Sequence, residues 1–104
     1  MPNFKHMETI EWLNYWYSSN CNGYWEHSYG VKIDTLDNPG WWLRIDLVDT
    51  PLQGHKLNVK EVVTATDWYT ISCNGIKFEA FGDTTKLGPL IDLFRRFAED
   101  APAD

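Results

Sequence analysis

The sequence predicts an α+β fold in which an antiparallel sheet of about five strands carries an N-terminal and a C-terminal helix on one face. Three observations support this prediction. Apolar residues recur at helical spacing near both ends of the chain. Between these ends, apolar and polar residues alternate as they do in strands. Short turn sequences join the alternating segments, which favours antiparallel pairing over parallel pairing.

The first helix is expected within residues 7–20. Ile10, Leu13 and Trp16 recur there at helical spacing. The run of serine, asparagine and glycine over residues 18–23 then interrupts the pattern, so the helix should end in that run.

Two antiparallel strands joined by a turn are expected next. Polar and apolar residues alternate over residues 31–34 and again over 41–47, and Asp37–Gly40 between them suits a turn. Because side chains alternate along a strand, the apolar members should share one face and pack against the helices. These members are Val31, Ile33, Trp41, Leu43 and Ile45. The opposite face is available to a partner and should carry Lys32, Asp34, Trp42, Arg44 and Asp46.

The remaining strands follow a loop at residues 50–54. A third strand is expected around residues 57–63, where the adjacent Val62 and Val63 disturb the alternation and suggest a β-bulge. The last two strands flank Asn74-Gly75, which suits a two-residue type I′ hairpin because both positions tolerate positive φ.

The last helix should begin after Thr84 or Thr85, either of which can cap it. Pro89 is compatible with a helix only if it lies in the first turn. The apolar residues of this helix line one side and are Leu87, Leu90, Ile91, Phe94 and Phe97.

The length and charge of the chain narrow the classes of function. A chain of 104 residues fits a single domain, residues 1–104, and its 43% hydrophobic content suffices for one core. The net charge of −6 argues against nucleic-acid binding, which needs a basic surface, and favours a basic protein partner. The acidic excess is concentrated in residues 26–50, which hold five acids and two bases.

Cysteine usage and hydropathy indicate a cytoplasmic protein. Cys21 and Cys73 form no CxxC pair, so we expect two reduced thiols. The first residues lack the apolar region of a secretory signal, and no stretch approaches the roughly 18 apolar residues of a membrane span. We therefore expect no membrane association.

Residues 25–29, WEHSY, are the most enzyme-like segment because they combine a carboxylate, an imidazole and hydroxyl groups. If the segment is a strand, Glu26 and His27 point to opposite faces and cannot act together as a catalytic pair. We therefore expect no enzyme activity, although a small hydrolase using these two residues remains an alternative. The histidines and cysteines lack the short spacings of zinc sites, so no metal or other cofactor is predicted.

Tryptophan is abundant, with six residues in the chain. Most of them occur in apolar periodic runs and should lie in the core, whereas Trp42 is out of phase with the core-facing residues. Trp42 with Arg44 and Asp46 combines the residue types of interface hot spots with charge that can fix the binding register. A module that binds a small ligand or carbohydrate is the alternative, and it would show several tryptophans lining an open groove.

The sequence also resembles the immunity protein 53 family. The resemblance is dense over residues 12–50 and thinner beyond, so it spans nearly the whole chain. Its most specific segments are WEHSYG at residues 25–30 and TLDNPGW at residues 35–41. Tyr24 departs from the pattern, because an acidic residue is usual after Gly23. The resemblance implies a bacterial immunity protein that neutralises a polymorphic toxin encoded beside it.

A partner-binding surface follows from this combination of residues and resemblance. Its predicted members are Glu26, Asp34, Asp37, Trp42, Arg44 and Asp46. The carboxylates would supply charge towards a basic toxin, and Trp42 would be the anchor. The sequence predicts neither the identity of the toxin nor the oligomeric state of the chain.

Overall fold

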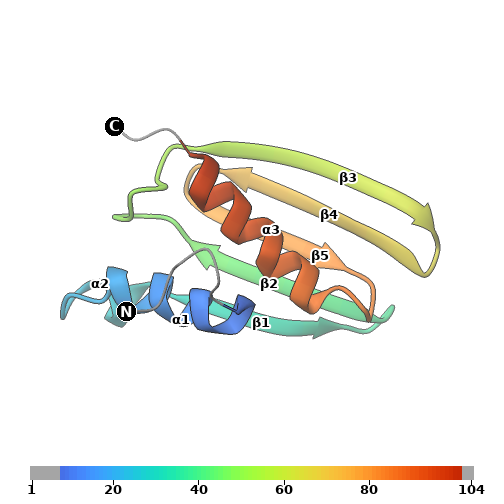
Figure 1. The fold of residues 1–104 in the computed structure, drawn as a ribbon, viewed down its shortest axis with the longest axis horizontal. Coiled ribbons are helices and arrows are strands. Elements are labelled where there is room, and N and C mark those ends of the chain that lie inside the picture. Colours follow the sequence, from blue (N-terminus) through green and yellow to red (C-terminus); the bar gives the residue numbers. More distant parts are fainter. Residues whose placement is uncertain (1–7, 102–104) are drawn as a thin grey trace.

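Five strands form one antiparallel sheet in the computed structural model, which describes residues 8–101. They are β1 (Val31–Leu36), β2 (Gly40–Asp46), β3 (Lys56–Thr64), β4 (Asp67–Asn74) and β5 (Lys77–Gly82). Helices α1 (Thr9–Asn20) and α3 (Leu87–Asp100) lie over the same face of the sheet, and the short helix α2 (Trp25–Ser28) precedes β1 (Figure 1). The structure confirms the predicted α+β class; Met7, in the segment predicted to form the first helix, lies outside the described residues.

The strands lie in the order β1-β2-β5-β4-β3, so β1 and β3 are the edges of the sheet. The β2–β5 pairing joins the hairpin β1–β2 to the hairpin β4–β5, and β3 adds to the outside of β4. The centre of the sheet is therefore built from strands that are distant in the sequence. No helix within residues 8–101 is long and apolar enough to cross a membrane.

Aromatic rings dominate the core between the sheet and the helices. Phe94 of α3 lies at its centre, with ring centroids 4.9 Å from Trp16 and 5.0 Å from Phe78. Trp12 meets the same ring edge-on at 5.7 Å. Edge-to-face pairs of this kind add to the free energy that burial of the rings provides. Truncation of such a buried phenylalanine to alanine typically costs about 3–5 kcal/mol.

The register of β1 and β2 places their side chains on the predicted faces. Ile33 pairs with Leu43 on the helix side, whereas Asp34 pairs with Trp42 on the other side. Leu43 is fully buried, but Ile33 remains 45% exposed. The difference arises because β1 is an edge strand with a neighbour on only one side.

Two turn predictions had different outcomes. The β-bulge is confirmed, because the register of β3 against β4 shifts between Val62 and Thr64. The type I′ turn is wrong: Cys73 pairs with Phe78, so residues 74–77 form a longer connection. Within residues 8–101, Asp49 is the one residue other than glycine with positive φ. Asn74 instead accepts hydrogen bonds through Oδ1 from the backbone N–H groups of residues 76 and 77, at 2.9 and 3.0 Å.

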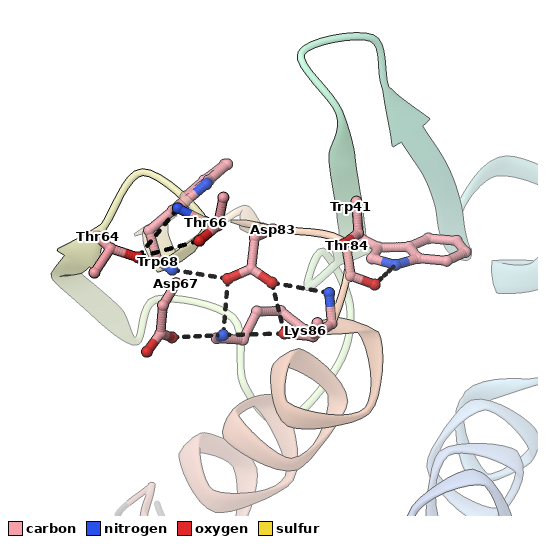
Figure 2. A network of polar contacts seen from close by, with 9 residues as sticks. Trp41, Thr64, Thr66, Asp67, Trp68, Asp83, Thr84 and Lys86 are labelled. Atoms are coloured by element: carbon pink, nitrogen blue, oxygen red, sulfur yellow. Dashed lines mark hydrogen bonds and ion pairs between the residues drawn. The ribbon is translucent and has the colours of Figure 1, made fainter.

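The turn before α3 is organised by Asp83, not by a threonine cap as predicted. The Asp83 carboxylate, in a residue only 4% exposed, accepts hydrogen bonds from the backbone N–H groups of Trp68 and Thr85, both at 2.8 Å. It also forms an ion pair with the Lys86 ammonium at 2.7 Å, and Lys86 bonds to Asp67 at 2.8 Å (Figure 2). We call Asp67, Asp83, Thr85 and Lys86 the Asp83 network.

The Asp83 network fixes where α3 begins relative to the sheet. The Lys86 ammonium, and next the Thr85 hydroxyl, hold the pKa of Asp83 well below its usual range. The carboxylates of Asp67 and Asp83 in turn raise the pKa of Lys86. Because the network joins the start of β4, the end of β5 and the start of α3, it holds three elements together. Pro89 lies in the first turn of α3, as predicted.

Candidate functional site

The face of the sheet away from α1 and α3, here the open face, carries both charged and aromatic side chains. The strand registers place five bases on it, Lys32, Arg44, Lys56, Lys60 and Lys77. They place three acids there, Asp34, Asp46 and Glu79. The open face is therefore locally richer in positive charge, although the whole chain has a net charge of −6.

Trp42 lies on β2, on the open face, and its neighbours hold it in place. Its ring stacks on Phe81 of β5, with centroids 5.9 Å apart and an interplanar angle of 11°. Its Nε1 donates a hydrogen bond to the Glu79 carboxylate at 3.1 Å. The Arg44 guanidinium lies over the ring, 5.8 Å from its centroid. Because these contacts already fix the ring, a partner that contacts it would lose little conformational entropy.

A solvent-open depression of about 710 Å³ lies where α1 and α2 meet the ends of β1, β2 and β5. We call it the α2 pocket. Its charged lining residues are Glu26, Lys32, Arg44, Asp46 and Lys77. His27, Ser28 and Tyr29 of the WEHSYG segment also line it.

Helix α2 is positioned by side chains that bond to its own backbone. Asn22 Oδ1 accepts hydrogen bonds from the N–H groups of Tyr24 and Trp25, at 2.9 and 3.0 Å. The Glu26 carboxylate accepts hydrogen bonds from Asn22 N at 2.9 Å and Gly23 N at 2.8 Å. Hydrogen bonds from backbone N–H groups, that of Glu26 itself first, lower the pKa of the Glu26 carboxyl. Glu26 thus closes the loop before α2 and remains ionised.

Trp25 and Asp46 attach this segment to the sheet. Trp25 is buried, and its Nε1 donates to the carbonyl of Val48 at 2.8 Å. Asp46 Oδ2 accepts a hydrogen bond from Gly30 N at 3.0 Å, and Asp46 N donates to Gly30 O at 3.0 Å. The Asp46 carboxylate therefore holds the chain as it enters β1.

Three cations of the α2 pocket form no ion pair with any other residue of 8–101. Among residues 8–101, the ion pairs are those of Lys86 with two aspartates and that of Arg95 with Glu99. Lys32, Arg44 and Lys77 belong to none of them. Lys32 lies directly opposite Arg44 in the β1–β2 register, an arrangement of like charges that disfavours strand pairing.

Comparison with known proteins identifies the family. The family model described as immunity protein 53 matches residues 10–99. The chain belongs to the immunity protein 53 family. The matched region runs from α1 into α3 and includes the open face and the α2 pocket. No curated protein and no solved structure matches the chain.

In this immunity protein 53 family member, the predicted site residues fall into separate places. Glu26, Arg44 and Asp46 line the α2 pocket, and Arg44 also borders a second depression of about 490 Å³. Asp34 and Trp42 line that second depression. Asp37 lies in the β1–β2 turn, at the opposite end of these strands.

The sequence interpretation missed Lys77, Glu79 and Phe81. The alternation in β5 places these three residues on one face, which could have been recognised from the sequence. Their position beside Trp42 and Arg44 follows only from the β2–β5 pairing.

Glu26 and His27, the residues of the catalytic alternative, both lie on α2 and line the α2 pocket. Residues 25–28 form a helix, so the argument that assumed a strand at Glu26 and His27 does not apply. The Glu26 carboxylate is occupied by backbone N–H groups. Within residues 8–101, no side-chain hydrogen bond links His27 to a nucleophile, and no three His, Cys, Asp or Glu side chains are grouped to hold a metal ion.

The tryptophans are divided between the core and the two faces of the sheet. Trp12, Trp16 and Trp25 are buried in the core. Trp41 lies on the helix side, where its Nε1 donates to the Thr84 carbonyl at 3.0 Å. Trp42 lines a depression on the open face. The strand register places the half-buried Trp68 of β4 on the same face, opposite Val62, and not in the core.

Proposed function

We propose that this immunity protein neutralises a polymorphic toxin in the cytoplasm of the producing cell by binding it directly, without catalysis, as a single domain of residues 1–104. The observation that carries the proposal is the open face, which lies on the side of the sheet away from α1 and α3 (Figure 1). The strand registers place Trp42 and its neighbours on this face. Membership of the immunity protein 53 family supports the protective role.

Trp42 and Arg44 have the chemistry of an interface hot spot. Tryptophan and arginine are enriched among residues that dominate binding energy, and such residues occur near the centre of an interface. Both lie on β2, which is one of the inner strands of the sheet. The stacking of Trp42 on Phe81 reduces the ordering cost of binding.

The carboxylates contribute in two ways in this proposal. Asp34 lies beside Trp42, and Asp37 lies in the β1–β2 turn at the rim of the proposed interface. Both carboxylates add charge complementarity to a basic toxin. The net charge of −6 adds a long-range attraction that speeds the encounter. Glu26 and Asp46 shape the surface through their backbone hydrogen bonds.

The test uses the polypeptide encoded immediately upstream of the gene as the toxin. We expect wild-type protein to bind it and to rescue cells that express it. Trp42→Ala should weaken binding by about 30-fold or more, because hot-spot truncations cost about 2 kcal/mol or more. Ile10→Ala is the matched control, because Ile10 is 56% exposed on α1, away from the open face.

Urea unfolding of each variant shows whether weaker binding results from a lost contact or from an unfolded protein. Trp42→Phe is a second variant that keeps an aromatic ring stacked on Phe81. Absence of binding and of rescue by the wild type would overturn the proposed function. Binding that is unchanged in Trp42→Ala and in Arg44→Ala would keep the function but remove the open face from it.

A further inference from the structure

We infer that the α2 pocket receives an acidic side chain of the toxin, whose carboxylate is bound between Lys32, Arg44 and Lys77. This inference rests on the proposed function and specifies the chemistry of the partner at one place. It is compatible with a toxin of net positive charge, because a contact between partly buried groups is screened less by salt than the longer-range attraction between the two proteins.

The pocket brings cations together from three neighbouring strands. Lys32 lies on β1, Arg44 on β2 and Lys77 on β5, and all three line the same depression. Arg44 and Lys77 are half-buried, so part of the hydration that stabilises their charge is lost. A carboxylate placed among them would replace that lost hydration with charge-assisted hydrogen bonds.

The acids of the pocket do not neutralise these cations. Both oxygens of Glu26 already accept backbone N–H groups. Asp46 uses Oδ2 to hold Gly30, and it forms no ion pair with Lys77, its partner in the β2–β5 register. The described part of the chain therefore supplies no ionic partner to the three cations.

The strand registers place Arg44 between Lys32 of β1 and Glu79 of β5, and Arg44 forms no ion pair with Glu79. Like charges directly opposite each other on neighbouring strands are destabilising, and a bound anion would relieve the repulsion. Local conflicts of this kind are expected at functional sites. Arg44 is also ordered by the Trp42 ring, so its planar group is held in place for bidentate contact with a carboxylate.

The experiment measures toxin affinity and dissociation rate for Lys32→Glu and Arg44→Glu. Lys32→Glu creates a Glu–Arg pair across β1 and β2, so the fold should be retained while the pocket becomes repulsive. Arg44→Glu creates a Glu–Lys pair with Lys32 but also places the new glutamate opposite Glu79 of β5, so urea unfolding checks that this variant is folded. We expect each substitution to weaken toxin binding by at least about tenfold, mainly through faster dissociation. Lys60→Glu is the matched control, because Lys60 is an exposed lysine of the open face on β3, opposite the neutral Thr70.

Charge-swap rescue identifies the occupant. Toxin variants with single Asp→Lys or Glu→Lys substitutions on the surface are each tested for binding to the Arg44→Glu variant of this protein. At least one of them should restore binding. Inorganic phosphate, titrated into the free protein, distinguishes a small-anion site. Phosphate binding that is lost in Arg44→Glu, without any rescuing toxin variant, would overturn the inference.

Failure of the inference is distinguishable from failure of the proposed function. Equal loss of affinity in Lys60→Glu and the pocket variants would show a general effect of charge and overturn the inference. Unchanged affinity in the pocket variants, with the loss in Trp42→Ala retained, would overturn the inference and keep the proposed function. Absence of wild-type binding would overturn both.

Discussion

The two ends of the sheet each carry a cluster of charged side chains, and the clusters are built in opposite ways. In the Asp83 network, Asp67, Asp83 and Lys86 all take part in ion pairs, and backbone N–H groups supply further bonds to Asp83 (Figure 2). In the α2 pocket at the other end, Lys32, Arg44 and Lys77 are in no ion pair of the described chain.

The comparison distinguishes charges that serve the fold from charges that are available to a partner. A buried carboxylate is tolerated when its hydrogen bonds are complete, and it then becomes costly to remove. Cations that no carboxylate of the described chain neutralises add nothing comparable to stability. The Asp83 network should therefore respond strongly in unfolding experiments, and the α2 pocket should respond in binding experiments.

Removal of the Asp83 carboxylate should have the largest effect on stability. In Asp83→Ala the backbone N–H groups of Trp68 and Thr85 lose their acceptor, and Lys86 retains Asp67 as its ionic partner. We expect the urea midpoint to fall by more than in the alanine variants of Lys32, Arg44 and Lys77, with the m-value unchanged.

Asp34→Ala is the matched control for Asp83→Ala. The Asp34 side chain is exposed and accepts one hydrogen bond, from the N–H of Thr35 at 2.7 Å. Its loss should leave the urea midpoint nearly unchanged. Equal midpoints for the two variants would mean that the Asp83 network does not stabilise the fold.

The pH dependence of stability provides the second test. The folded-state pKa of Asp83 lies below its ordinary value, so its stabilisation is complete above about pH 4 and is lost as the pH falls towards the folded-state pKa. The lowered pKa of Glu26 acts in the same direction. Lys86 has a raised pKa, so its contribution is complete below the ordinary lysine pKa and is lost as the pH rises above it.

Urea unfolding between pH 7 and pH 3 should therefore show a steeper loss for the wild type than for Asp83→Asn. Asp37→Asn is the control, because Asp37 lies in the exposed β1–β2 turn and its side chain makes no hydrogen bond within the described residues. Its curve should follow that of the wild type. Parallel curves for the wild type and Asp83→Asn would contradict the assignment.

The sequence predicted the face of the sheet or helix that a side chain occupies better than it predicted which distant segments contact each other. Alternation placed Leu43 on the core side and Trp42 on the open face, and both positions are confirmed. Helical spacing likewise identified Phe94 as a core residue. These properties depend on residues close together in the chain, so periodicity is sufficient to reveal them.

Contacts between distant segments could not be predicted in the same way. The cations of the α2 pocket come together because β2 pairs with β5, and no periodicity encodes that choice of neighbour. The Asp83 network likewise joins residues from β4, β5 and the start of α3. Helix α2 was missed because a single helical turn is too short to show the apolar spacing of a helix.

Lys32→Ala should have the smallest effect on stability. The substitution removes the like charge opposite Arg44, so the free energy of unfolding should stay the same or rise by up to about 0.5 kcal/mol. Lys60→Ala is the control, because the residue opposite it, Thr70, is neutral and no repulsion is relieved. Urea unfolding at low and at high salt measures the difference, and salt should reduce any gain in Lys32→Ala because it screens the repulsion.

A loss of more than about 1 kcal/mol in Lys32→Ala would show that Lys32 supports the fold. The contrast between the Asp83 network, whose charges stabilise the fold, and the α2 pocket, whose cations do not, would then not hold for Lys32. Lys32 is the most exposed of the three cations, so it is the one expected to contribute least to stability.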